Sequence, residues 1–136
     1  MKEHEKKQSS KRIELPPSVK EVIWWPQNLT DEIKKNWPVD VKREGGLQLG
    51  RVQQGLEPLN FRIMSSVGVG VREIKIQDKD KSQYRLLYIA TFPEAVYVIH
   101  VITKKTSEQT SKHDIDIARK RFNDLTTRRK LSKRNE

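Results

Sequence analysis

The sequence predicts an α+β fold in which helices pack on an antiparallel sheet. Three β-prone runs follow one another at about 69–77, 83–90 and 95–103, without a helical pattern between them. The segments that separate these runs, DKDKS and TFP, have the composition of hairpin turns. Helical patterns lie before and after the three runs. Strands grouped in this way favour an antiparallel sheet with the helices beside it.

Three elements are expected before this sheet: a short β-prone run at 21–25, a helix at about 31–36 and a second helix at about 39–54. Thr30 can cap the first of these helices, and Pro38 suits the first turn of the second. Gly45 and Gly46 lie inside the second helix and weaken it, since each glycine costs about 1 kcal/mol relative to alanine. Residues 55–68 are expected to form a linker into the sheet.

A last helix is expected to begin near Ser111, because Ser111 and Asp114 have the spacing of a capping box. Its apolar residues repeat at steps of three and four and form a stripe that can pack on the sheet: Ile115, Ala118, Phe122 and Leu125. The opposite face of this helix is basic and contains Arg119, Lys120, Arg121, Arg128, Arg129 and Lys130.

The net charge of +10 is concentrated at the two ends of the 136-residue chain. Residues 1–20 contain six Lys and Arg against three Asp and Glu, and residues 101–136 contain eleven against five. Residues 21–100 are nearly neutral, with eleven against ten. This distribution favours a polyanionic partner, although solvated tails would have the same composition. We divide the chain into a disordered basic extension at 1–15, one folded domain at 16–127 and a basic C-terminal tail at 128–136.

The chain contains no cysteine, which excludes a disulfide framework and a cysteine-based metal site. No apolar run approaches the roughly 20 residues that a membrane-spanning helix needs. The first residues, MKEHEKKQSSKR, are charged and lack the apolar segment of a signal peptide. We therefore expect a cytoplasmic protein that uses no membrane, no metal and no cofactor.

Cations interrupt the three β-prone runs: Arg72 and Lys75 in the first, Arg85 in the second, and Lys104 with Lys105 at the end of the third. Because alternate residues of a strand share a face, Lys75, Arg85 and Lys104 are expected to gather on the concave face of the sheet. Such a cluster is typical of a surface that holds an anion. From the pattern alone, surface cations paired with neighbouring carboxylates are the simpler interpretation.

Three segments closely resemble one protein family: GLQLGRVQQGLEPLNFRIMSSVGVGVREIKI, YRLLYIATFPEAVYVIHVITKKT and DIDIARKRF. The resemblance is to the phage-derived branch of the RelE/HigB-type toxins of type II toxin–antitoxin systems, in the RelE/ParE superfamily. It covers about residues 21–125 in one register. It implies a microbial-ribonuclease-like fold, with helices around a curved antiparallel sheet, and cleavage of translated messenger RNA on the ribosome. It also implies a helix-turn-helix antitoxin of the HigA/XRE-like kind, with operator DNA bound only through the toxin–antitoxin complex.

RNA carries its own nucleophile, the 2′-hydroxyl, so its cleavage needs no metal ion. It needs a base for that hydroxyl, stabilisation of the charge on the phosphorane and a proton for the leaving oxygen. We predict that Arg85 stabilises the phosphorane, because its planar fork stays charged, and that Lys75 or Lys104 transfers protons. His100 is a further candidate base, because its pKa lies near neutrality. An Arg85→Ala variant is expected to fold and to lose cleavage.

The remaining predicted site residues position RNA and are Arg72, His100, Lys105, Arg119, Arg128 and Arg129. Two structural alternatives stand beside these assignments. His100 can be a packed or hydrogen-bonded sheet histidine, and the last helix can be basic because it meets an acidic antitoxin.

A non-catalytic RNA- or DNA-binding regulatory module with the same fold is the alternative function. Lys75 stands where the relatives usually carry Arg, which removes a bidentate phosphate contact. Ile102 stands where they usually carry an aromatic residue, which removes a base-stacking surface. A metal-dependent nuclease is less favoured, because the three histidines, His4, His100 and His113, are scattered in the sequence.

Overall fold

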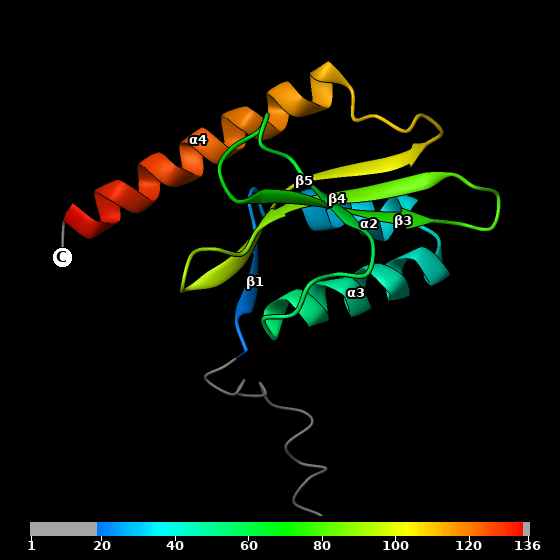
Figure 1. Cartoon of the computed structure of the whole chain (residues 1–136), viewed down its shortest axis with the longest axis horizontal. Helices are drawn as coiled ribbons and strands as arrows, with labels where there is room; N and C mark the ends of the chain where they lie inside the picture. Colours follow the sequence, from blue (N-terminus) through cyan, green and yellow to red (C-terminus); the bar gives the residue numbers. More distant parts are fainter. Residues whose placement is uncertain (1–18, 135–136) are drawn as a thin grey trace, which may run out of the picture.

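A five-stranded mixed sheet forms the centre of the structure, a computed structural model that describes residues 19–134 (Figure 1). Its strands are β1 (Glu21–Trp24), β2 (Phe61–Ile63), β3 (Val71–Gln77), β4 (Gln83–Ile89) and β5 (Ala95–Lys105). They lie in the order β1-β5-β4-β3-β2. β1 runs parallel to β5, and the other three pairs are antiparallel.

Helices cover both faces of this sheet (Figure 1). They are α2 (Leu29–Asn36) and α3 (Val39–Gln53) on one face and α4 (Lys112–Arg134) on the other. One buried apolar cluster lies between α2, α3 and the sheet and includes Trp37, Leu49 and Leu86. A second lies between α4 and the sheet and includes Ile99 and Leu125. The α+β class that the sequence predicts is confirmed.

α3 forms despite its internal glycines because Gly45 is a packing position. A Cβ atom at Gly45 would lie 3.3 Å from a ring carbon of Trp37 and 3.5 Å from the side chain of Ile76. Glycine therefore lets the helix approach the sheet closely. Burial of Val41 and Leu49 on the same helix offsets the low helix propensity of this residue.

Two parts of the sheet differ from the prediction. β1 pairs in parallel with β5, with Glu21 opposite Ala95 and Trp24 opposite Val98, so the sheet is mixed and not wholly antiparallel. The long connection through the helices and the other strands makes this parallel pairing possible. β2 lies inside the segment predicted as a linker and pairs with β3. Its three residues are too few to produce a recognisable alternating pattern.

α4 begins as predicted. The backbone N–H of Asp114 donates to Ser111 Oγ at 3.1 Å, and Ser111 Oγ donates to Asp114 Oδ2 at 2.8 Å. The helix continues through residues 128–134, which were predicted as a basic tail. The extension predicted at 1–15 lies outside the described residues. Within residues 19–134, no helix combines the length and the apolar character needed to cross a lipid bilayer.

Candidate functional site

Five polar side chains gather on the α4 side of the sheet, beyond the point where α4 begins. We call them the polar cluster: Arg62 from β2, Glu73 and Lys75 from β3, and Gln83 and Arg85 from β4. Lys75 lies directly opposite Arg85 in the pairing of β3 with β4. Glu73 and Arg85 are buried, with exposed fractions of 0% and 1%. Charged groups at this depth are tolerated only when partners satisfy them.

The loop between β5 and α4, residues 106–111, covers Arg85. The Nη2 atom of Arg85 donates to the carbonyl oxygen of Ser107 and to Gln83 Oε1, and Nη1 donates to the carbonyl oxygen of Gln109 at 3.5 Å. Its Nε atom is buried and has no hydrogen-bond partner in the described part of the chain. Arg85 therefore lies on the predicted face, but the loop closes its guanidinium off from solvent.

Glu108 of the same loop brings a carboxylate to Lys75. Lys75 Nζ donates to Glu108 Oε1 at 3.2 Å, and Gln83 Nε2 donates to Glu108 Oε2 at 3.1 Å. The hydrogen bond from Lys75 lowers the pKa of Glu108 below its usual value. A loop carboxylate thus occupies a position in which a phosphate oxygen could bind Lys75.

Glu73 connects the loop to the edge of the sheet. Its carboxylate accepts hydrogen bonds from Arg62 Nε at 3.1 Å and from Thr110 Oγ1. Arg62 Nη2 also donates to the carbonyl oxygen of Glu108 at 2.7 Å. The polar cluster is therefore bonded to four successive loop residues, Ser107, Glu108, Gln109 and Thr110.

A β-bulge near the end of β5 changes the face predicted for Lys104. Ile102 lies opposite Arg85, but Lys105 lies opposite Gln83, so one extra residue of β5 separates these pairs. Lys104 has a φ of 52°, in the left-handed region. The prediction that strand alternation places Lys104 with Ile102 is therefore wrong, and the register brings Lys105 beside the polar cluster. Both lysines are exposed.

His100 lies between β5 and α4. Its Nε2 atom is 2.8 Å from Asp114 Oδ1, and Arg121 Nη1 donates to His100 Nδ1 at 2.9 Å. Because a guanidinium can only donate, Nδ1 is the acceptor and Nε2 carries the proton. Burial lowers the pKa of His100, which favours the neutral ring. With 6% of its surface exposed, His100 has the arrangement of a packed sheet histidine and not that of an RNA contact.

Two of the predicted RNA-binding arginines lie away from the polar cluster. Arg72 is on the opposite face of the sheet, where its guanidinium lies 4.8 Å from the ring centre of Phe61 and 3.7 Å from the carboxylate of Glu57. Arg119 lies on α4 and donates to the carbonyl oxygen of Ser66 at 2.7 Å. Both side chains have protein partners that an RNA phosphate would have to replace.

Arg128 and Arg129 are neighbours near the C-terminal end of α4 but differ in their contacts. Arg129 Nε lies 2.6 Å from Glu94 Oε2, and the guanidinium stacks 3.7 Å from the ring centre of Phe92. The hydrogen bond from Arg129 lowers the pKa of Glu94 to about 2. Arg128 is 66% exposed, and within the described residues its one ion pair is with Asp124 at 3.5 Å. Arg128 is thus the one available to an external anion.

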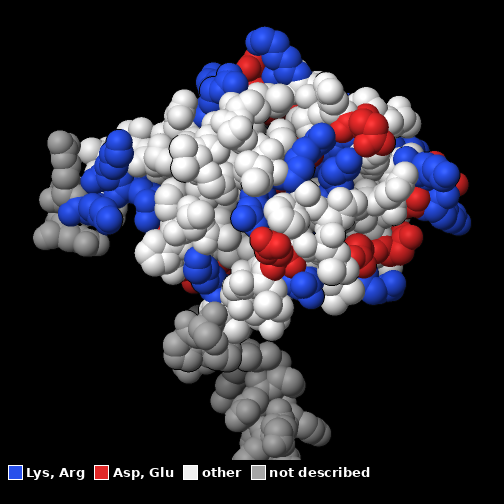
Figure 2. Space-filling view, in the orientation of Figure 1, with Lys and Arg blue, Asp and Glu red and all other residues white. Residues whose placement is uncertain are grey.

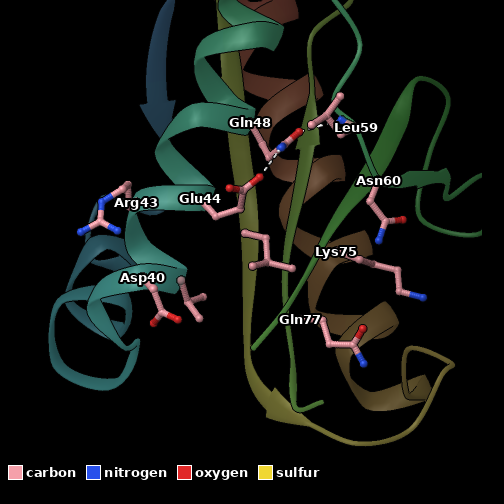
Figure 3. Close-up of a pocket in the computed structure, with 10 residues that line it drawn as sticks. Asp40, Arg43, Glu44, Gln48, Leu59, Asn60, Lys75 and Gln77 are labelled. Atoms are coloured by element: carbon pink, nitrogen blue, oxygen red, sulfur yellow. Dashed lines mark hydrogen bonds between the residues drawn. The ribbon is translucent and has the colours of Figure 1, made fainter. Parts of the chain in front are cut away.

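Lys75 also borders an open hollow of about 470 Å³ beside the edge of β3 (Figure 3). Figure 3 shows Lys75, Gln77 and Asn60 extending from one side of this hollow, with Glu44 of α3 on the other side. Acidic and basic groups are mixed around it, so its lining does not define one ligand. It gives Lys75 an approach from solvent that Arg85 lacks.

Sequence reasoning missed four contributors to this site: Arg62, Glu73, Gln83 and Glu108. Arg62 fell in the predicted linker, and Glu108 falls between a predicted strand and a predicted helix. Glu73 offered the one usable signal. It lies in the middle of a predicted strand, and an acid that is buried there must have a partner. Within residues 19–134, no three His, Asp or Glu side chains lie close enough together to hold a metal ion.

The arrangement defines a class of protein: an α+β domain, compatible with the RelE-like fold, that carries a cationic cluster on one sheet face. The chain belongs to the Gp49-like family of phage-derived proteins (DUF891), a toxin-like family related to the RelE/HigB superfamily. The family match covers residues 31–123, which include the whole polar cluster and the loop above it. Comparison with curated proteins and with solved structures gave no match.

Proposed function

We propose that this protein is the toxin of a type II toxin–antitoxin system and cleaves messenger RNA on the ribosome during translation. The observation that supports this most directly is the pair formed by Lys75 and Arg85. Two cations stand directly opposite each other on neighbouring strands, and the Glu108 carboxylate lies against Lys75. Like charges in this position are unfavourable unless an anion lies between or beside them. A scissile phosphate is an anion that would satisfy both.

Each residue of the pair has a role in the proposed reaction. The 2′-hydroxyl gives up its proton and attacks the adjacent phosphate, and negative charge develops on the equatorial oxygens of the phosphorane. The bond from phosphorus to the 5′-oxygen then breaks, the 5′-oxygen takes up a proton, and a 2′,3′-cyclic phosphate remains. Arg85 stabilises that charge through its planar guanidinium, and Lys75 binds a second oxygen or transfers a proton. Glu73 is a positioning residue, because it orients Arg62 and is bonded to Thr110 of the loop. The enzyme forms no covalent intermediate in this scheme.

The loop must move before Arg85 can contact RNA. Phosphate oxygens would replace the carbonyl oxygens of Ser107 and Gln109 on the guanidinium, and Glu108 would leave Lys75. This exchange is consistent with an enzyme that depends on the ribosome to present the substrate, since a free RNA strand alone would compete poorly with a covalently attached loop. We expect weak cleavage of naked RNA for that reason.

The proposed partners follow from this role. A helix-turn-helix antitoxin of the HigA/XRE-like kind would neutralise the protein, and operator DNA would be bound only by the complex of the two. The ribosome would present messenger RNA. Co-expression with the gene encoded beside this one, followed by purification through a tag on either chain, tests the antitoxin directly.

Replacement of Lys75 with Ala tests the proposed activity. Lys75 is 19% exposed and its removal leaves no buried charge unpaired, so the variant should fold. We expect new 5′ ends inside translated reading frames after a brief pulse of wild-type expression. The Lys75→Ala variant should reduce these ends by about 10²- to 10⁴-fold, the usual contribution of a proton-transferring group. Primer extension on total RNA measures the effect.

Lys75→Arg is the matched control, because it keeps the cation and should retain charge stabilisation. Arg85→Ala is a poorer test than the sequence alone suggested. Arg85 is 1% exposed and bonded to two loop carbonyls, so its loss is expected to destabilise the fold as well as the activity. Identical RNA ends from wild type and a folded Lys75→Ala variant would contradict the proposed activity.

A non-catalytic RNA-binding module is the second candidate. The observation that favours it is the closed state of the site, in which loop atoms already satisfy Arg85 and Lys75. The pulse experiment separates the two candidates. RNA that co-purifies with wild-type protein, without new 5′ ends and without growth arrest, would support the binding module.

A further inference from the structure

A long groove lies between α4 and the end of β1, away from the polar cluster. Two adjacent hollows of about 750 Å³ and 430 Å³ form it, and both are lined by Trp25 and Arg128. The two hollows adjoin at these residues, and we call them together the α4 groove. Its other side-chain contributors include Lys120 and Arg121 at one end and Lys133 at the other.

Trp25 gives the α4 groove a fixed aromatic surface. Its backbone N–H donates to the carbonyl oxygen of Val98 at 2.8 Å, which holds the residue against the sheet edge. Its ring meets Tyr97 edge to face, with 6.5 Å between ring centres. The indole is only half-buried, and the remaining surface lines both hollows. A ring held from behind in this way is suited to stack against a planar ligand group.

Three cations that line the α4 groove are available to an external ligand: Lys120, Arg128 and Lys133. Lys120 and Lys133 are exposed and take part in no ion pair within the described residues, and Arg128 has a single long one. Lys120 and Lys133 are thirteen residues apart, which is roughly 20 Å along the helix axis at about 1.5 Å per residue. Figure 2 shows Lys and Arg side chains gathered over the C-terminal end of α4.

The carboxylates near the α4 groove do not cancel this charge. Glu94 is occupied by Arg129 and by the hydroxyl of Tyr97, and Asp124 faces Arg128 at 3.5 Å. The lining thus combines the indole of Trp25 with three cations, Lys120, Arg128 and Lys133, and nearby carboxylates do not neutralise their summed charge. An acidic peptide would satisfy the cations but would leave the flat face of Trp25 without a matching group, whereas single-stranded nucleic acid supplies both phosphates and planar bases.

We propose that the α4 groove binds single-stranded RNA, with a base stacked on Trp25 and phosphates on Lys120, Arg128 and Lys133. Arg121, which lines one end of the groove, donates to His100, and His100 contacts Asp114 in the first turn of α4. The inference rests on the proposed function for the identity of its ligand, which is the strand that this function brings to Lys75.

Binding of a 12-nucleotide 2′-O-methyl RNA to the full chain tests this inference. The modified RNA has no free 2′-hydroxyl, so binding is measured by fluorescence anisotropy independently of cleavage. Trp25→Ala is expected to weaken binding about tenfold without changing its salt dependence, as loss of one stacked base does. The double variant Lys120→Gln with Arg128→Gln should weaken binding at least tenfold. The slope of the logarithm of the binding constant against the logarithm of the salt concentration should become less steep by about 1.4, because each lost phosphate contact contributes about 0.7.

The matched control is Lys35→Gln with Lys130→Gln, which removes the same charge from exposed positions outside the α4 groove. Its affinity should fall less than twofold. Trp25→Phe should restore most of the affinity lost in Trp25→Ala, which separates stacking from a folding defect. Equal losses in the control and in the groove variant would overturn the inference, because binding would then depend only on net charge.

Two further outcomes distinguish an RNA ligand from a protein ligand, and RNA binding in the α4 groove from the proposed cleavage. An acidic peptide that binds wild type and loses affinity in the groove variants, while RNA affinity stays constant, would overturn the inference in favour of a protein ligand. RNA binding that survives with no cleavage by wild type would contradict the proposed function and still support the groove.

Discussion

One face of the sheet lies under two different covers, and the residues buried beneath them differ accordingly. Where α4 crosses the sheet, β4 buries apolar side chains, Leu87 and Ile89. Where the loop of residues 106–111 crosses it, the same strand buries Gln83 and Arg85. The same strand therefore has two kinds of core along its length, and the change coincides with the start of α4.

The backbone that covers the sheet therefore determines which side chains can be buried beneath it. The backbone groups within a helix are already hydrogen-bonded, so α4 offers the sheet mainly side chains, and apolar residues pack best against it. A loop retains free carbonyl oxygens, and three of them accept hydrogen bonds from Arg62 and Arg85. A loop of few apolar contacts is also easier to open than a packed helix. We therefore expect the functional side chains to lie under the loop and not under α4.

The largest effect is expected when the loop-covered part loses its buried carboxylate. Glu73→Ala leaves Arg62 without its ion-pair partner and Thr110 without its acceptor. Loss of these two hydrogen bonds to a buried carboxylate lowers the free energy of unfolding by about 3 kcal/mol. The loss is not greater because Arg62 is 37% exposed and solvent can reach its charge. Urea denaturation followed by circular dichroism measures the change. Amide hydrogen exchange should show the greatest loss of protection in residues 106–111.

Leu125→Ala provides the comparison under the helix. Leu125 is 1% exposed, and its truncation should cost about 2–5 kcal/mol through the cavity that remains. The loss of protection from amide hydrogen exchange in this variant should extend along α4, and protection in residues 106–111 should be nearly unchanged. If Glu73→Ala and Leu125→Ala altered exchange in the same residues, the two covers would form one cooperative unit and the comparison would fail.

A smaller effect is expected when the loop alone loses its charge. Glu108→Gln removes the negative charge that lies 3.2 Å from Lys75 and leaves the fold intact, because this side chain is 77% exposed. RNA phosphate then competes with a neutral amide, and affinity for the modified RNA should rise about three- to tenfold. Charge-assisted hydrogen bonds are roughly twice as strong as neutral ones, which sets this range.

The control for this variant is Glu57→Gln, which removes an equally exposed carboxylate from the opposite face of the sheet, where it lies near Arg72. Its RNA affinity should change by no more than the small amount expected of net charge alone. An increase of equal size in both variants would show that Glu108 acts through overall charge and not through its contact with Lys75.

The sequence predicted the elements of both covers better than it predicted the site between them. Periodicity located β3, β4, β5 and α4, because each buries a regular apolar stripe, and Ser111 marked the start of the helix. The bulge that separates Lys104 from Lys105 breaks the strict alternation on which the face assignment depended. Contacts from a loop, such as those of Glu108, depend on the folded path of the chain and have no periodic signal.

The smallest effect concerns the helix-covered part and its ion pair between Glu94 and Arg129. The hydrogen bond from Arg129 lowers the pKa of Glu94 to about 2, from an ordinary value of 4.5. A carboxyl with a lowered pKa stabilises the fold at pH values above its unfolded pKa. This stabilisation is lost as the pH falls from about 4.5 toward 2. Because Glu94 is 42% exposed, solvent screening reduces its contribution to about 1 kcal/mol or less.

Urea denaturation of wild type and Glu94→Gln at pH 6 and pH 3 measures this contribution. The difference in unfolding free energy should be greatest at pH 6 and should shrink toward pH 3. At pH 3 the Glu94 carboxyl of the unfolded wild type is protonated, whereas the glutamine of the variant does not titrate. Other carboxyls titrate in both proteins and cancel in the difference. Arg129→Gln should remove the same pH-dependent part, together with a pH-independent loss of its stacking on Phe92. A difference that stays constant with pH would mean that Glu94 contributes by packing and that the α4 end is not held by charge.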